Sequence, residues 1–237
     1  MKKLLCTFTI VSLIVSLLVT FVACDTPEKT STHNPLEINR VACVGDSLTY
    51  GHSWHDESYP VYLQELLGQD VEVRNFGKNG AAVTNRNESS FTLKYDTLQE
   101  YRDSIAFEPD VVVIMLGTND GYNWTGSQPT FMEEYEKLID SYFDAGVQEV
   151  VMLISPPTLP GNAFNLPNNV IGTQVCPLQR ELAEEYGLPI VDVRNAFETH
   201  LDMQSLFRLP ANSDGVHLSV KGAELVAKLV ADVLATL

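Results

Sequence analysis

Residues 110 to 116 read Asp-Val-Val-Val-Ile-Met-Leu, and this stretch decides the fold class. After its first residue it is continuously apolar, and half of its apolar side chains are valines. A strand that is apolar on both faces is typical of a parallel sheet, in which helices cover both sides. The polar turn Gly117-Thr118-Asn119-Asp120 follows at once and indicates the carboxyl end of that strand. The stretch therefore predicts the centre of a buried parallel sheet.

Strands and helices alternate on both sides of this stretch. Further strands are predicted at residues 40–44, 71–75, 149–154 and 189–193, and helices at residues 59–67, 131–143, 178–186 and from Ser219 onward. Strands separated by helix-length segments imply right-handed crossovers and an α/β fold with a five-stranded parallel sheet. In such folds ligands bind beyond the carboxyl ends of the strands, so we expect the chemistry to collect there.

Four polar segments fall at or beside these strand ends. They are residues 45–51 (Gly-Asp-Ser-Leu-Thr-Tyr-Gly), 75–82 (Asn-Phe-Gly-Lys-Asn-Gly-Ala-Ala), 117–121 (Gly-Thr-Asn-Asp-Gly) and 214–217 (Asp-Gly-Val-His). A serine between a strand and a helix is presented near helix N-terminal amides, and glycines let the backbone approach a ligand. Asp and His three residues apart on one loop can share a hydrogen bond that leaves the other imidazole nitrogen facing outward. Taken alone, each segment is more commonly an ordinary turn, loop or helix cap.

In this order and at these spacings, the four segments resemble the blocks of the SGNH, or GDSL-type, serine hydrolase superfamily. The resemblance covers the chain from about Arg40 to the C-terminus. It implies a flavodoxin-like three-layer α/β/α sandwich, in agreement with the predicted strands. It also implies a serine esterase in which Ser47 attacks an ester carbonyl, His217 takes the hydroxyl proton, and Asp214 orients the imidazole.

The same resemblance implies an oxyanion hole. Its donors would be the backbone N–H groups of Ser47 and Gly80 and the side-chain amide of Asn119. Gly77 is a weaker candidate than Gly80, because the family pattern places this donor at the second glycine of the segment 75–82. No cofactor is implied, and no cluster of residues in the sequence has the spacing of metal ligands.

The third segment continues to Trp124 and resembles a subgroup of bacterial GDSL proteins often linked with carbohydrate acetylesterases. Tyr122 and Trp124, with Trp54 and Tyr59, are candidates for an aromatic rim on which a sugar ring stacks, or else they pack the loops. The expected substrate is a short-chain acyl ester, above all an acetyl ester, on a small molecule or glycan. A lysophospholipase or thioesterase would use the same triad with a long apolar groove. A glycan-binding protein without catalysis would lack the nucleophile or the base, and both are present.

Other polar residues near these segments have less direct roles. His52 and His55 follow the nucleophile too closely to meet its hydroxyl and are expected at the rim or on the surface. Asp46 is expected to bond the backbone amides that shape the nucleophile turn, and Asp120 to brace the third loop in a similar way.

The N-terminus predicts export. A short basic start is followed by an apolar run from Leu4 to Val22, which is typical of a signal peptide. Phe21-Val22-Ala23-Cys24 resembles a bacterial lipoprotein cleavage box, although Phe21 stands where Leu is usual. Residues 1–23 are therefore predicted to be a lipoprotein signal peptide, and Cys24 a lipidated residue that holds the enzyme at a membrane outside the cytoplasm. Ordinary secretion and a retained membrane helix are the alternatives.

Residues 24–37 are polar and are predicted to form a tether, which leaves residues 38–237 as one hydrolase domain. The net charge of −16 argues against a nucleic-acid partner, because phosphate binding depends on clustered Lys and Arg. It also disfavours a strongly anionic polymer as substrate. Cys43 and Cys176 remain in the mature chain, either as a disulfide or, since Cys43 lies in an apolar strand, as buried thiols.

Overall fold

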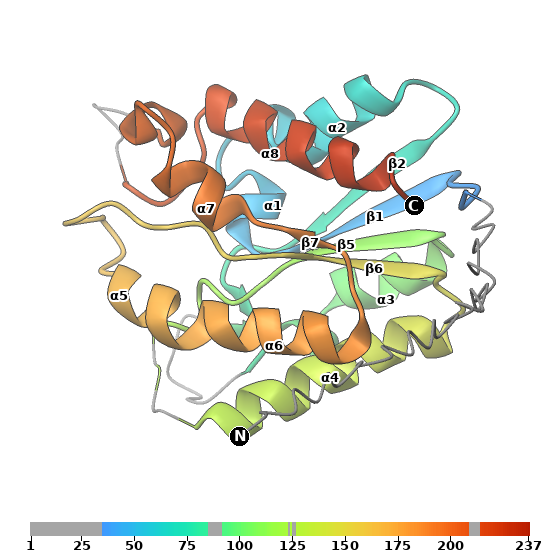
Figure 1. Cartoon of the computed structure of the whole chain (residues 1–237), viewed down its shortest axis with the longest axis horizontal. Coiled ribbons are helices and arrows are strands. Elements are labelled where there is room, and N and C mark those ends of the chain that lie inside the picture. The colour runs from blue at the N-terminus through green and yellow to red at the C-terminus, as the bar shows by residue number, and fades with distance from the viewer. Residues whose placement is uncertain (1–34, 85–91, 123, 125–126, 209–213) are drawn as a thin grey trace, which may run out of the picture. The chain divides into compact units, whose positions relative to one another are not determined.

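Five parallel strands form the central sheet in the order β2-β1-β5-β6-β7 (Figure 1). Their bounds are β1 Arg40–Gly45, β2 Glu72–Gly77, β5 Val111–Met115, β6 Glu149–Leu153 and β7 Ile190–Val191. Every residue of β5 is buried, as its continuous apolar sequence predicts. The predicted five-stranded parallel sheet is confirmed, and its strand order is that of the flavodoxin-like fold.

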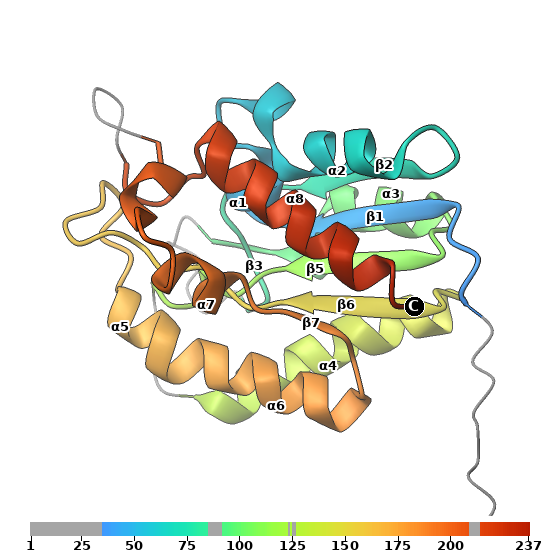
Figure 2. The same ribbon diagram turned by 45° about the horizontal axis from the view of Figure 1, so that its top comes forward.

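Helices cover both faces of this sheet. On one face α2 (Tyr59–Leu67) packs beside α8 (Val220–Leu234), and α3 (Gln99–Ala106), α4 (Gln128–Asp144) and α6 (Cys176–Tyr186) cover the other face (Figure 2). The predicted three-layer α/β/α sandwich is therefore confirmed.

Shorter elements connect these layers. They are α1 (Ser47–Tyr50), α5 (Asn168–Val170), α7 (Val193–Glu198), the strand pair β3 (Ala81–Ala82) and β4 (Leu93–Lys94), 3₁₀ turns at His55–Glu57, Tyr95–Thr97 and Met203–Leu206, and a π-helical turn at Ile171–Val175.

The computed structural model describes residues 35–84, 92–122, 124, 127–208 and 214–237. The unit that carries the fold runs from Pro35 to Leu237 and so begins slightly before the boundary predicted at residue 38. The backbone N–H of Leu36 donates to the carbonyl oxygen of Leu237 at 2.9 Å. The predicted signal peptide, Cys24 and most of the tether lie outside the described residues. Within the described segments, no helix is both long and apolar enough to cross a bilayer.

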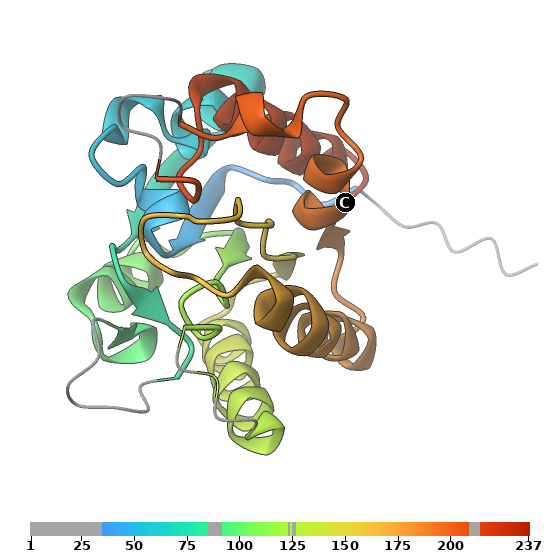
Figure 3. The same cartoon turned by 90° about the vertical axis from the view of Figure 1, so that its left-hand side faces the viewer.

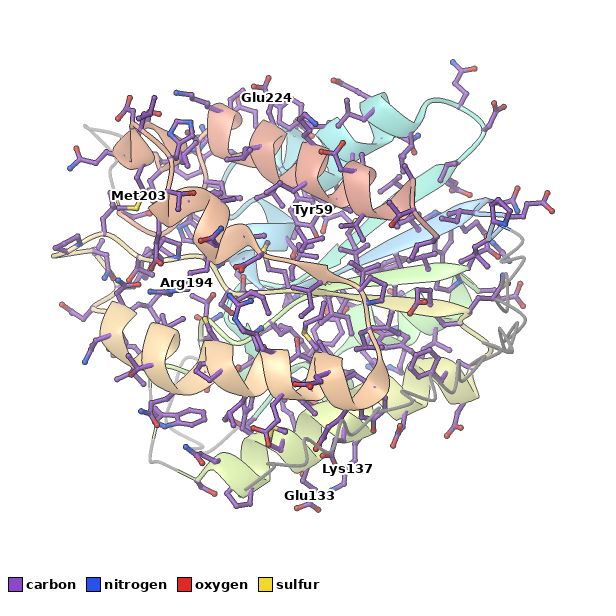
Figure 4. The ribbon with its side chains drawn as sticks, viewed as in Figure 1. Tyr59, Glu133, Lys137, Arg194, Met203 and Glu224 are labelled. Atoms are coloured by element: carbon purple, nitrogen blue, oxygen red, sulfur yellow. The ribbon has the colours of Figure 1, made fainter. Side chains whose placement is uncertain are left out.

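Helix α4 has the buried face that its sequence predicts. The five side chains expected on its apolar side are all buried, namely Phe131, Tyr135, Leu138, Ile139 and Tyr142. Charged residues occupy the opposite face, where Glu133 and Lys137 form an ion pair at 2.9 Å, one helical turn apart (Figure 4).

Strand β7 and helix α3 are among the elements that differ from the sequence-based expectation. The strand predicted at residues 189–193 is shorter, because Asp192 caps α7 by accepting a hydrogen bond from the N–H of Asn195 at 3.0 Å. Helix α3 was not expected. Its sequence is mostly polar, and Ser104 is its one fully buried residue.

The two described cysteines are buried and free. Cys43 lies in β1 and Cys176 begins α6. The disulfide alternative is therefore wrong, and the expectation of buried thiols is confirmed. Burial raises the pKa of Cys43 to about 12 and that of Cys176 to about 11, so both thiols stay protonated and unreactive at neutral pH.

Candidate active site

The register of the sheet brings three of the four polar segments together. Gly45, at the end of β1, pairs with Gly77 of β2 on one side and with Met115 of β5 on the other. Because β1 is the middle strand of the three, the loop that carries Ser47 lies between the loops that follow β2 and β5. Figure 3 looks onto this edge of the sheet, where the carboxyl ends of the strands point toward the viewer.

Close packing and a helix cap shape the nucleophile turn. Asp46 caps α1, because its Oδ1 accepts a hydrogen bond from the N–H of Leu48 at 2.8 Å. A Cβ atom at Gly45 would lie 2.1 Å from Oγ1 of Thr49, so only glycine fits there. Ser47 is consequently the first residue of the helix, where backbone N–H groups have no partner within the helix.

His217 contacts both Ser47 and Asp214. Its Nε2 lies 2.8 Å from Oγ of Ser47, and its Nδ1 lies 2.6 Å from Oδ2 of Asp214. Burial acts to raise the pKa of Asp214, but hydrogen bonds from the ring and backbone of His217 hold that pKa below its ordinary value. An ionised carboxylate only accepts hydrogen bonds, so Nδ1 of His217 carries the hydrogen. Nε2 is then the acceptor for the Ser47 hydroxyl.

The loop that carries this pair is fixed from two sides. Oδ1 of Asp214 accepts hydrogen bonds from the backbone N–H groups of Val216 and His217, at 2.8 and 2.7 Å. The carbonyl oxygen of Asp214 in turn accepts from the N–H of Ala163 at 2.7 Å. The segment from residue 156 to 170 therefore crosses the active-site face and holds the loop in place.

The three predicted oxyanion donors line one cleft together with His217. Ser47, Gly80 and Asn119 all contribute to its wall. Nδ2 of Asn119 donates to the carbonyl oxygen of Ala81 at 2.9 Å, which fixes the orientation of the amide. Gly80 has a φ of +78°, in the left-handed region that favours glycine. Donors on neighbouring loops of this kind can converge on a single oxygen atom.

Two buried aspartates brace these loops, as their sequence positions suggest. Asp120 accepts hydrogen bonds from the backbone N–H groups of Val83 and Thr84 at 3.0 and 2.8 Å. It thereby holds the loop after segment 75–82 against segment 117–121. Asp46 caps the nucleophile helix, and burial raises its pKa from 3.8 to about 7. The N–H of Leu48 acts in the opposite direction, and the charge of Asp120 adds to the rise.

The cleft beside Ser47 has a volume of about 500 Å³. Besides Ser47, Gly80, Asn119 and His217, its polar lining consists of His52, Asn79, Thr92 and Asn165, and its less polar lining of Tyr122, Ala163, Phe164, Leu166 and Val216. Within the part of the chain that the structure describes, no group of three or more His, Cys, Asp or Glu side chains is arranged to hold a metal ion. The lining suits a neutral molecule that offers both hydroxyl groups and apolar faces.

One of the four aromatic residues predicted at the substrate rim lines this cleft. Tyr122 does so and is 42% exposed. Tyr59 is fully buried beneath α8, so its assignment to the rim is wrong (Figure 4). Trp54 and Trp124 are not among the lining residues. The guanidinium of Arg208 covers the Trp54 ring at 4.1 Å, and Trp124 packs against an aromatic ring of α4.

Two aromatic rings contact His217 that were not predicted from the sequence. The ring of His52 stacks on it, with centroids 4.0 Å apart, and Phe164 approaches edge-on at 5.3 Å. His55, by contrast, is exposed. Gly51 is the sequence signal that could have indicated the position of His52. It ends the one-turn helix α1 in the left-handed conformation, so the chain turns back toward Ser47.

Comparison with known proteins identifies relatives along most of the chain. A family model described as GDSL-like Lipase/Acylhydrolase matches residues 43–225. An acetylxylan esterase from Xylanibacter ruminicola is 31% identical over an alignment of 215 residues, and the match covers 81% of this chain and 42% of that protein. The chain thus spans less than half the length of that relative. An acetylxylan esterase from Geobacillus stearothermophilus is 30% identical over an alignment of 159 residues, and the match covers 63% of this chain and 70% of the relative.

Solved structures share the fold at lower sequence identity. A carbohydrate acetylesterase from Sinorhizobium meliloti superposes with a TM-score of 0.66 at 19% identity, covering 84% of this chain and 99% of that one. A lipase/acylhydrolase from Enterococcus faecalis gives a TM-score of 0.64 at 22% identity, covering 84% and 97%. At these identities the likeness establishes the three-layer fold.

Proposed function

This chain belongs to the GDSL-like lipase/acylhydrolase family, and we propose that it is a carboxylic ester hydrolase that removes acetyl groups from carbohydrate. The observation that carries the proposal is the continuous contact from Ser47 through His217 to Asp214, at 2.8 and 2.6 Å, beside an open cleft. A hydroxyl, a base and an orienting carboxylate in that order are what acyl transfer requires.

The first step forms an acetyl-enzyme. Oγ of Ser47 attacks the carbonyl carbon while its proton passes to Nε2 of His217, since a free hydroxyl is a poor nucleophile at neutral pH. Asp214 stays ionised and stabilises the imidazolium that results. The carbonyl oxygen becomes an oxyanion that accepts from the N–H groups of Ser47 and Gly80 and from the Asn119 amide, each donor contributing about 3 kcal/mol.

The intermediate then collapses and is hydrolysed. The bond to the sugar oxygen breaks, and His217 gives its proton to that oxygen, so the sugar leaves with a free hydroxyl group. Water next attacks the acetyl carbonyl and gives its proton to His217, and a second tetrahedral intermediate forms in the same oxyanion hole. When the bond to Ser47 breaks, Oγ recovers its proton from His217, and acetic acid leaves and ionises to acetate.

The polar part of the cleft lining supports a carbohydrate rather than a lipid substrate. Asn79 and Asn165 offer hydrogen bonds to sugar hydroxyls, and the exposed ring of Tyr122 offers an apolar face for a pyranose. A lysophospholipase or thioesterase of the same family would need a long apolar groove, in which such groups would be desolvated without partners. The two relatives named acetylxylan esterases agree with this choice.

Acyl-chain profiling tests the proposal. Turnover of aryl esters from acetate to long chains is measured beside acetate release from acetylated xylo-oligosaccharides, with Ser47→Ala as the control. We expect turnover to fall steeply beyond short chains, acetate to be released from the oligosaccharides, and the variant to be inactive. A preference for long chains, or no acetate release, would exclude the carbohydrate substrate.

We further propose that the protein works outside the cytoplasm, anchored to a membrane by a lipid on Cys24. The basic and apolar leader and the cleavage-box sequence support this location. Metabolic labelling with palmitate should mark the wild-type protein and leave Cys24→Ala unlabelled. Equal labelling of both proteins would rule the anchor out.

A further inference from the structure

The cleft contains a second imidazole that the proposed mechanism does not use. The ring of His52 stacks on that of His217, with centroids 4.0 Å apart and planes 14° from parallel. Its backbone has a φ of +50°, which residues other than glycine rarely adopt, and its N–H donates to the Ser47 carbonyl oxygen at 3.0 Å. Such a conformation persists only where the surrounding structure imposes it, and it often marks a functional site.

The surroundings of His52 favour its neutral form. Among the described residues its buried Nδ1 has no hydrogen-bond partner, so a protonated ring would bury an unsatisfied N–H. Burial lowers the pKa of His52, and the nearby His217 lowers it further, whereas Asp214 acts in the opposite direction. The other rings that face it, Trp54 and Phe164, lie 6.1 and 6.0 Å away between centroids and carry no charge.

From this geometry we propose that His52 is a positioning residue for ester hydrolysis, whose neutral ring stabilises the imidazolium of His217 when Ser47 gives up its proton. The inference rests on the proposed function of the triad. A cation is attracted to the face of an aromatic ring, and the observed separation is within reach of that attraction. A second positive charge at the same place would repel the imidazolium, so protonation of His52 suppresses the reaction.

Two measurable effects follow for ester hydrolysis. Loss of the ring lowers kcat by about 2- to 30-fold, the range expected for a cation–π contact, and leaves KM nearly unchanged. The reason is that the positive charge develops on His217 during the reaction and is absent from the ground state. In acid, the slope of log kcat/KM against pH approaches two rather than one, because the reaction requires both imidazoles in their neutral forms.

Three single variants separate these effects. His52→Asn removes the ring, and asparagine tolerates the left-handed backbone. His52→Phe keeps an aromatic face that does not titrate. His55→Asn is the matched control, because it changes an exposed imidazole of the same loop that lies outside the cleft lining. Each is assayed with an aryl acetate across the acid range, and thermal melting checks its folding.

We expect His52→Asn to have a lower kcat than the wild type at a nearly unchanged KM. We expect His52→Phe to have a kcat close to that of the wild type and an acid limb of slope one throughout. His55→Asn should match the wild type in both measurements. A wild-type kcat in His52→Asn, or a steepening limb in His52→Phe, overturns the inference. If His52→Asn does not fold, the acid limb of His52→Phe decides. Activity that survives Ser47→Ala removes the proposed function itself, whereas an inactive Ser47→Ala beside a fully active His52→Asn removes this inference alone.

Discussion

Replacing Asp214 by asparagine tests whether the carboxylate sets the hydrogen position on His217. In the native loop, Oδ1 accepts from the N–H groups of Val216 and His217, so the asparagine oxygen keeps that place. The NH₂ group then replaces Oδ2, 2.6 Å from Nδ1 of His217. Because an NH₂ group only donates, Nδ1 must become an acceptor and Nε2 must carry the hydrogen. Nε2 can no longer accept the proton of Ser47.

We expect the loss of a base in the correct tautomer to lower kcat about 10⁴-fold, or by about 5 kcal/mol. Both backbone hydrogen bonds survive, so the free energy of unfolding changes by less than about 1 kcal/mol. Asp214→Ala is the contrasting variant. It loses both bonds and should lose stability as well, by about 1–3 kcal/mol for each N–H left unsatisfied. Steady-state hydrolysis of an aryl acetate and urea denaturation measure the two effects. A kcat for Asp214→Asn within tenfold of the wild type would refute this assignment of the hydrogen.

Three further predictions concern the neighbouring residues. Asn119→Ala should lower kcat about 10²- to 10³-fold with little change in KM, and a larger effect on KM than on kcat would contradict an oxyanion role. Asp46→Asn should change the pH dependence of stability. Since burial raises the pKa of Asp46 from 3.8 to about 7, the folded protein keeps a proton that the unfolded chain has lost, and wild-type stability falls as pH rises between those values. Asparagine also caps helices, so denaturation of the variant at about pH 5 and about pH 8 should show a smaller fall, and an unchanged fall would argue against the buried titration. Gly45→Ala should melt well below the wild type, because its Cβ would lie 2.1 Å from Oγ1 of Thr49. An unchanged melting temperature would show that the turn can adjust.

The fold was predictable because its main signals are local. The continuous apolar sequence of β5 and the helical period of α4 each depend on one segment, and both are found as expected. The polar helix α3 carries no such signal. The length of β7 depends on whether Asp192 continues the strand or caps the helix that follows, and the sequence is compatible with both.

The central residues of the site were predictable for a topological reason. Segments that follow neighbouring parallel strands must meet at one edge of the sheet, so the order of the first three polar segments was sufficient to bring them together. The fourth segment, residues 214–217, precedes α8 and follows no strand of the sheet, so its place beside Ser47 was expected from the family resemblance alone. The aromatic surroundings depend on side-chain directions, which the sequence does not show. Tyr59 is the first residue of α2, and its side chain lies on the buried face of that helix. His52 stacks on His217 because its own backbone is left-handed and because the loop that carries His217, far away in the sequence, lies beside it.

Covalent labelling of the nucleophile tests the central claim most directly. The protein is incubated with an alkyl phosphonate that reacts with activated serine hydroxyls, digested, and mapped by mass spectrometry. We expect one adduct, on the peptide that carries Ser47, and its disappearance in His217→Ala, because the hydroxyl is activated only by the imidazole 2.8 Å away. An adduct on a different residue, or labelling of Ser47 that persists at full rate without His217, would contradict the catalytic unit described above.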